Sequence, residues 1–560
     1  MKITNHIQKI KDFIPGEMTT SQQALVLSTL ETCLHVIGEL KGEVQALKDE
    51  INRLKGEQGK PTIAAKNQKS SEDSDAPDDP SQKTKPISSE KERKKKGKKR
   101  AKKRVKFDGS VRIDREEVLD IEDKSDLPLD IEFKGYATSH YQDLEIKATL
   151  IALKRAIYYS PSTGKTYTAG LPEEYEVGQD YTQALKGHIL MFKFEMGLSI
   201  PKIGDFLRMN GVDISDGTIS NIILAGGDFF QQTSELIHQT GVQTGLYVQT
   251  DTTGSRVNGV NWHTHIFGNE YYSAYFTRLH KDRQTVLDII RLDQPRIYLL
   301  NEETYTIYKY LKIPKKIWQC LTTLDIGQPV DQNSFSTQLK SVLSSEEYNK
   351  HEQKLLEGAY LAAYKSANPL HILVVDDAPQ YKLLASLIVL CWVHIGRHFK
   401  KLNPTLKYHQ QLLRDFLDDF WAFYHRLNDY KKTPDIIDQQ QLIEDFDELF
   451  SRKTGYEHLD ERIAKTRAKK KQLLVVLKHP YVPLHNNAAE LDARKEVRYR
   501  DISFQTRNQK GTKTKDTFFT IIQTCKKLGV NAYAYILDQI TRKKKMTPIH
   551  KVILQKANIQ

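Results

Sequence analysis

The chain of 560 residues is too long for one compact core, and the usual size of domains predicts about three or four units. Its 84 lysines and arginines exceed its 71 aspartates and glutamates, and the net charge of +13 favours a polyanionic partner such as nucleic acid. The four cysteines have no close pair, so neither a disulfide framework nor a cysteine zinc site is indicated. No apolar run reaches the ~18 residues of a membrane span, and residues 1–13 lack the apolar core of a signal peptide, so we expect a cytoplasmic protein with no membrane partner.

Residues 1–65 carry a heptad pattern. Apolar residues recur every seven positions in two registers, Leu30, Ile37, Val44, Ile51 and Cys33, Leu40, Leu47, Leu54. Such spacing predicts a short coiled coil and therefore a homodimer. A single amphipathic helix packed on its own domain is the alternative.

Residues 66–106 have almost no large apolar side chains and are predicted to be a disordered basic linker. Its basic end would bind DNA phosphates without sequence preference. The candidate side chains are Lys94, Lys95, Lys96, Lys98, Lys99 and Arg100. A tether that only keeps the chain in solution is an equal alternative.

Residues 107–178 are predicted to form a small β unit, because segments such as 144–150 and 156–159 alternate apolar and polar residues. The stretch 159–167 resembles a degenerate zinc-ribbon knuckle with serine and threonine where cysteines would stand. Hydroxyl groups are poor zinc ligands, so we expect no zinc here. Residues 179–243 follow as a helical region. The segments 198–207 and 215–224, on either side of a turn at Gly211, have the proportions of a DNA-binding helix-turn-helix, which any two packed helices can imitate.

Residues 244–541 have the element order of an α/β catalytic domain. A strand at 246–251 ends in Asp251, and strands at 260–267 and 271–276 follow after the turns Asn258–Gly259 and Gly268–Asn269. A helix is expected at 283–291.

The run 370–377 is continuously apolar until its final acids, Asp376 and Asp377, which is typical of a central parallel strand, and a helix is predicted at 380–401. Three antiparallel strands, a helix, a buried strand and a helix are the order of an RNase H-like domain with a mixed sheet. In that fold the first and fourth strands are neighbours, so Asp251 would meet an acid of the later strand. Helical insertions are expected near 294–368 and 407–471, and a basic tail at 542–560.

Glu490 is the third candidate acid. It follows a predicted helix start at Asn486 or Asn487, and Arg494 lies four residues later, where a solvated ion pair is the alternative role. Carboxylates that converge repel one another unless a cation lies between them, and oxygen ligands favour Mg²⁺ or Mn²⁺.

His394, Arg397 and His398 are predicted to share a helix. The two histidines are four residues apart, a spacing that could bind zinc, but no third ligand is suggested. Contact with DNA phosphate, or positioning of the metal site, is therefore preferred for His394 and Arg397, with a core histidine as the alternative.

Several spaced motifs in the second half of the chain carry a resemblance to a known family. They are Val375–Tyr381, Cys391–Phe399, Asn486–Glu490 with Arg494, Arg500–Phe504 with Gly511, and Thr524–Leu537. Together they resemble the transposases of the insertion-sequence 66 family.

The resemblance implies a DDE transposase that cuts the ends of its own element and joins them to target DNA. Asp251, Asp376 and Glu490 would hold two Mg²⁺ or Mn²⁺ ions and no zinc, and Asp377 is the alternative second acid. Asp376 is preferred because related integrase-like enzymes have an aromatic residue five positions after the acid, as Tyr381 is here.

The resemblance also implies partners and a location. His394, Arg397, Arg494 and Arg500 join the linker cations as candidate DNA contacts. The expected partners are the transposon end repeats, target DNA, a second copy of the chain and, in some systems, accessory proteins, at the nucleoid of a bacterial cell. The alternative is a catalytically inactive DNA-binding protein derived from a transposase.

Overall fold

The computed structural model describes residues 40, 43–44, 113–120, 135–141, 143–144, 146–172, 175, 180–324, 327–367 and 369–557. Most of the predicted coiled coil and all of the predicted basic linker lie outside these residues. Of the described residues, those in Arg155–Gly204 and Ser215–Gln560 form one compact unit, and those in Ser70–Lys154 and Asp205–Ile214 form another. No helix in the described ranges combines the length and the apolar character that a membrane crossing needs.

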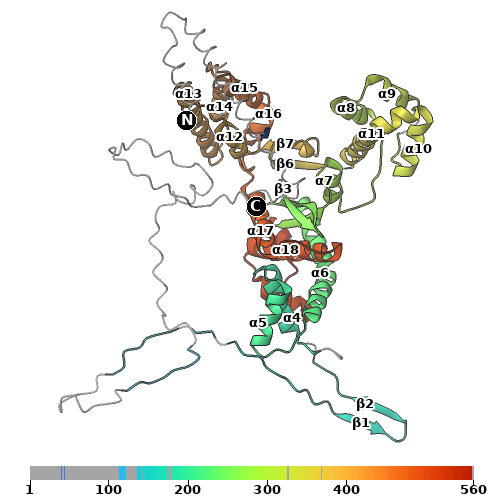
Figure 1. Ribbon diagram of the computed structural model, residues 1–560, viewed down its shortest axis with the longest axis vertical. Helices are drawn as coiled ribbons and strands as arrows, with labels where there is room; N and C mark the ends of the chain where they lie inside the picture. The colour runs from blue at the N-terminus through green and yellow to red at the C-terminus, as the bar shows by residue number, and fades with distance from the viewer. Residues whose placement is uncertain are drawn as a thin grey trace, which may run out of the picture. The chain divides into compact units, whose positions relative to one another are not determined.

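A five-stranded mixed sheet is the centre of the larger unit (Figure 1). Its strand order is β5-β4-β3-β6-β7, with bounds β3 Val248–Val257, β4 Val260–Gly268, β5 Ser273–Arg278, β6 Leu370–Val375 and β7 Ala385–Leu390. The first three strands form an antiparallel meander, whereas β6 runs parallel to both β3 and β7. Asn258 and Gly259 join β3 to β4 with φ angles of 47° and 77°, which is the left-handed geometry that a two-residue hairpin turn requires.

The sequence expectations for this sheet need two corrections. First, β3 continues six residues past Asp251 to Val257, so this acid lies within the strand and not at its end. Second, the predicted helix at 380–401 is wrong in its first half, because Ala385–Leu390 is strand β7 and only α12, Trp392–Lys400, is an α-helix. A short apolar run has no period that separates a buried strand from a buried helix.

The predicted small β unit is reduced to one hairpin among the described residues. It consists of β1, Ile157–Ser160, and β2, Lys165–Thr168, which pair in antiparallel fashion around Gly164. Leu144 and residues 146–150 form no strand, although they alternate apolar and polar residues. An alternating pattern becomes a strand only where a partner strand is available, and the described residues provide none for this segment.

The helical region begins with α4, Gln183–Phe194, α5, Ile200–Met209, and α6, Asp216–Thr244. Ser215 caps α6, because its side chain accepts a hydrogen bond of 3.1 Å from the backbone N–H of Thr218. The helix is 29 residues long and continues well beyond the predicted 215–224. The DNA-binding role of these helices stays a prediction.

Helices also fill the two predicted insertions and the C-terminal part. The first insertion holds α8 Glu302–Tyr310, α9 Lys315–Cys320, α10 Gln332–Val342 and α11 Ser345–Ser366, after α7 Arg283–Ile290. The second holds α13 Lys407–Tyr430, α14 Ile436–Leu449, α15 Glu457–Arg467 and α16 Lys470–Leu473. The chain then forms α17 Asn487–Ser503, α18 Gln509–Leu528, α19 Ala532–Ile540 and α20 Ile549–Ala557. The predicted basic tail is wrong where α20 lies, since Ile549 and Ile553 of this helix are fully buried.

Glycines in the middle of α6 allow this helix to pack closely against α18. A Cβ atom at Gly227 would lie 2.2 Å from Oγ1 of Thr514, whose side chain is buried and β-branched. We expect Gly227→Ala to lower the free energy of unfolding by about 1–3 kcal/mol, because neither helix can yield without moving its backbone. Gly217→Ala in the first turn of α6 is the matched control. Its Cβ would meet nothing closer than 3.7 Å, so equal losses from the two variants in denaturant titrations would contradict this packing.

Candidate active site

Asp251 and Asp376 come from neighbouring strands. The parallel ladder pairs Val248 with Leu373 and Gln249 with Val374. Continued by two residues in the same register, it brings Asp251 opposite Asp376, just beyond the end of β6. The two strands that the element order predicted to be neighbours are therefore adjacent in the sheet.

Asn486 fixes the start of α17, and with it Glu490, against the sheet. Its side-chain amide donates a 2.7 Å hydrogen bond to the carbonyl of Thr250, the residue before Asp251. Its backbone N–H donates to Sγ of Cys391 at 3.3 Å, and Asn486 is fully buried. The sequence placed an asparagine cap here, but the Asn486 side chain bonds to β3 and makes no cap hydrogen bond, so that part of the prediction is wrong.

Asp251 is affected by the charges of the other two acids. Burial is the largest cause that raises its pKa to about 6, and the charges of Asp376 and Glu490 raise it further. The backbone N–H of Thr252 and the guanidinium of Arg397 act in the opposite direction. A partly buried carboxylate among two others is stable at neutral pH when a cation neutralises the group.

Glu490 contacts two side chains of α12. Its Oε2 accepts a 3.0 Å hydrogen bond from Arg397, and its Oε1 lies 3.6 Å from Nδ1 of His394. These contacts, and not an ion pair with the exposed Arg494, are the ones that the structure gives to Glu490. Burial is the main cause that lowers the pKa of His394, while the charge of Glu490 raises it.

Asp376 and Asp377 have different surroundings. Asp376 accepts a 3.1 Å hydrogen bond from the N–H of Ala378 and contributes to the raised pKa of Asp251. Asp377 forms an ion pair with Lys469 at the end of the second insertion. A charge partner already neutralises Asp377, whereas Asp376 faces the other two acids.

A hydrogen-bonded chain beneath Asp251 was missed by sequence reasoning. His265 is buried, and burial lowers its pKa to about 4, so its ring is neutral. Its Nε2 faces the carbonyl of His280 at 3.1 Å and must donate, so its Nδ1 accepts from Thr252 at 3.1 Å. The Thr252 hydroxyl then accepts a 2.7 Å hydrogen bond from Tyr381. The aromatic residue that follows Asp376 by five positions therefore ties the two acid-bearing segments together.

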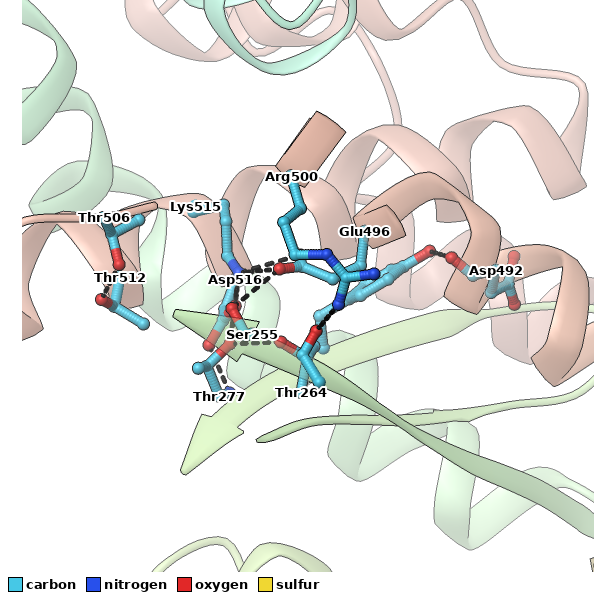
Figure 2. A network of polar contacts seen from close by, with 12 residues as sticks. Ser255, Thr264, Thr277, Asp492, Glu496, Arg500, Thr506, Thr512, Lys515 and Asp516 are labelled. Carbon is cyan, nitrogen blue, oxygen red and sulfur yellow. Dashed lines mark hydrogen bonds and ion pairs between the residues drawn. The ribbon is translucent and has the colours of Figure 1, made fainter. Parts of the chain in front are cut away.

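Helices α17 and α18 are joined to the meander through a buried polar network (Figure 2). Lys515 is only 1% exposed and contacts both carboxylate oxygens of Glu496 at 2.7 and 2.8 Å. Ser255 of β3 donates to the same carboxylate at 3.0 Å, and Asp516 accepts from the backbone and the side chain of Thr277 in β5. This network fixes α17, the helix that carries Glu490, against the sheet. The one sequence feature that indicates the network is the presence of charged residues on helix faces that are otherwise apolar.

The other predicted DNA contacts are spread over several places. The six cations from Lys94 to Arg100 lie outside the described residues. Arg494 is exposed on α17, while Arg500 of the same helix donates to the carbonyl of Gly254 in β3. His394 and Arg397 contact Glu490, which favours a positioning role in the absence of DNA.

The raised pKa of Asp251 predicts how pH changes stability. The folded state binds this proton more tightly than the unfolded chain, whose pKa is 3.8, so the contribution of Asp251 is fully present below about pH 4 and is lost as the pH rises through about 6. In EDTA, Asp251→Asn is therefore expected to be more stable than the wild type by about 1–3 kcal/mol at pH 8, with a smaller difference at pH 4. Denaturant titrations at both pH values measure this. Asp228→Asn on the exposed surface of α6 is the control, and an equal response of the two variants to pH would contradict the burial of Asp251.

Part of the sequence that forms this site is similar to a known protein family. Residues 345–514 match the family model described as "Transposase IS66 family". This part of the chain is therefore similar to the transposases of the IS66 family. The match confirms the resemblance predicted from the sequence motifs, and it includes Asp376, Glu490 and the Cys391–Phe399 segment but not Asp251.

A relative of this chain matches more of its sequence. It is the "Uncharacterized protein y4jO" of Sinorhizobium fredii (strain NBRC 101917 / NGR234), which is 28% identical over 302 residues. The aligned part is 54% of the present chain and 93% of the relative. The name of that protein assigns it no activity.

Proposed function

We propose that this IS66 family chain is an active DDE transposase with an RNase H-like catalytic core. It cuts DNA at the ends of its element in a reaction that depends on divalent metal, and it joins those ends to target DNA. The observation that supports the proposal is the strand register that brings Asp251 opposite Asp376, together with the charges of Asp376 and Glu490, which add to the effect of burial in raising the pKa of Asp251. The strand order β5-β4-β3-β6-β7 supports the RNase H-like assignment.

The side chains at this site fit a hard divalent cation. All three acids offer carboxylate oxygens, which Mg²⁺ and Mn²⁺ prefer, and burial, followed by the charges of Asp376 and Glu490, raises the pKa of Asp251. Oε1 of Glu490 is buried and has no hydrogen-bond partner among the residues that the structure describes, so it is available as a ligand. When bound, two such ions supply an activated water or 3′-hydroxyl and stabilisation of the leaving oxygen at a phosphodiester.

The other residues near the site have supporting roles in this proposal. Asn486 and the chain from Tyr381 to His265 hold the acids in place. Arg397 balances the charge of Glu490, and it can exchange this contact for a DNA phosphate because its side chain is 46% exposed. Arg494 lies one turn after Glu490 on α17, where it would contact the same DNA backbone. The predicted coiled coil would supply dimerisation, and the predicted basic linker would supply non-specific affinity for DNA.

The test is cleavage and joining of a labelled duplex that carries the element's end. The wild type is expected to nick and join it with Mg²⁺ or Mn²⁺, and not with EDTA. Asp251→Asn and Glu490→Gln keep the shape of the side chains but remove negative charge, so they should bind DNA without reacting. Variants that react like the wild type would refute the site. A wild type that binds ends but never cuts with either metal would favour the inactive DNA-binding alternative.

A further inference from the structure

A second set of potential ligands meets where α12 and α17 begin. Cys391 stands at the N-cap of α12, His394 lies in the first turn of that helix, and Glu490 lies in the first turn of α17. One ligand atom of each lies within 4.8 Å of the others. Ligand atoms around a tetrahedral zinc ion, with bonds of about 2.0–2.3 Å, are separated by about 3.3–3.6 Å. Small side-chain movements would therefore close this set around one ion.

Two of the three residues have polar atoms without partners at this point. Nδ1 of His394 and Oε1 of Glu490 are both buried, are 3.6 Å apart, and have no hydrogen-bond partner among the described residues. Buried polar atoms without partners are costly and uncommon in folded proteins. A cation bound between them would satisfy both.

The sulfur of Cys391 is also placed as a ligand. It accepts the backbone N–H of Asn486 at 3.3 Å, and it lies at the N-terminal end of α12. Burial raises the pKa of the Cys391 thiol to about 11, while backbone N–H groups such as that of Asn486 act in the opposite direction, so a bound metal ion would displace the proton of the thiol. The sequence suggested no third ligand for His394, and folding provides Cys391 and Glu490.

We propose that Cys391, His394 and Glu490 bind a borderline transition-metal ion of the Zn²⁺ type. Sulfur and imidazole ligands select such ions and discriminate against Mg²⁺, so this site differs in chemistry from the three carboxylates. Binding releases the proton of the Cys391 thiol. Because Glu490 belongs to both ligand sets, an occupied site withholds it from the carboxylate trio. This inhibitory consequence rests on the proposed function, whereas the binding itself does not.

Arg397 competes with the metal ion. It donates to Oε2 of Glu490 at 3.0 Å and to Nε2 of His394 at 3.2 Å. A guanidinium group can only donate, so the unprotonated ring carries its hydrogen on Nδ1 while Arg397 is in place. Coordination through Nδ1 moves that hydrogen to Nε2, and Arg397 must turn toward solvent. Arg397→Gln removes the competing charge and is therefore expected to tighten metal binding.

The experiment is a Co²⁺ titration of the full chain, followed by the thiolate-to-cobalt charge-transfer absorption in the near ultraviolet. The wild type should develop this band, and Cys391→Ser should abolish it. His394→Gln should weaken Co²⁺ binding by at least about tenfold, and Arg397→Gln should strengthen it. Two control variants should keep the band. Cys525→Ser changes another buried cysteine, and Asp251→Asn changes a residue that belongs to the carboxylate trio but not to the proposed zinc-type site.

Two results would overturn the proposal. One is a wild type without a thiolate band, and the other is a band that survives in folded Cys391→Ser. If Cys391→Ser does not fold, as judged by circular dichroism, unchanged affinity in His394→Gln has the same meaning. Inhibition of DNA cleavage by Zn²⁺ is measured separately, so a chain that binds Co²⁺ through Cys391 but never cuts DNA would refute only the proposed transposase activity.

Discussion

Asp376→Asn is expected to reduce cleavage of the element's end by roughly 10³-fold or more, whereas Asp377→Asn should change it less than about tenfold. The two aspartates are adjacent in sequence but differ in their contacts. Asp376 faces Asp251, while Asp377 is paired with Lys469. A loss of ~10³ corresponds to about 4 kcal/mol of transition-state stabilisation, which is the scale of one charged group that acts directly on the reacting atoms.

The measurement is single-turnover cleavage of a labelled duplex by each variant at saturating protein, with DNA binding recorded in parallel. Saturation separates the loss of chemistry from the loss of affinity. Lys469→Gln serves as an additional control, because it removes only the partner of Asp377. If Asp377→Asn were the inactive variant, the assignment of the second acid would pass to Asp377.

Lys515→Met is expected to lower the free energy of unfolding by about 3–5 kcal/mol. Lys515 is 1% exposed, and its removal leaves the carboxylates of Glu496 and Asp516 buried without their cation. Methionine keeps most of the volume of the side chain, so the loss reports the charge and not a cavity. Glu496, the partner of Lys515, lies on α17, the helix that also carries Glu490. The variant should therefore lose DNA cleavage at lower temperatures than the wild type.

Lys513→Met is the matched control for this network. Lys513 lies on the same helix, α18, but its side chain is 61% exposed and is 4.0 Å from Glu235. An exposed pair of this kind contributes about 0–1 kcal/mol. Denaturant titrations that showed equal losses for the two variants would mean that the Lys515 network does not stabilise the fold.

Much of the sheet followed from local patterns in the sequence. The Asn258–Gly259 turn and the apolar run before Asp376 predicted the meander and β6, and the structure contains both. Strand β7 was not predictable in the same way, because Ala385–Leu390 is too short and too uniformly apolar to show a period. The segment that forms α20 was predicted to be a basic tail because the prediction relied on its lysines and not on Ile549 and Ile553, which are buried.

The candidate site was predictable as a set of acids but not as a set of contacts. Acids at the ends of predicted strands indicated Asp251 and Asp376, and a predicted helix start at Asn486 or Asn487 indicated Glu490. The partners of these acids come from segments that are distant in sequence, so no local sequence pattern identifies them. Arg397 on Glu490, Lys469 on Asp377 and the amide of Asn486 on β3 all depend on how the helices dock on the sheet.

Binding of Mn²⁺ to the full chain tests most directly whether Asp251, Asp376 and Glu490 act as one metal site. Electron paramagnetic resonance can count the bound ions without DNA and without catalysis. The wild type should bind Mn²⁺ in competition with Mg²⁺. Asp251→Asn and Asp376→Asn should each lose at least one bound ion or bind it at least about tenfold more weakly. The control Asp228→Asn should bind Mn²⁺ like the wild type. Equal Mn²⁺ binding by the wild type and the two acid variants would contradict the account.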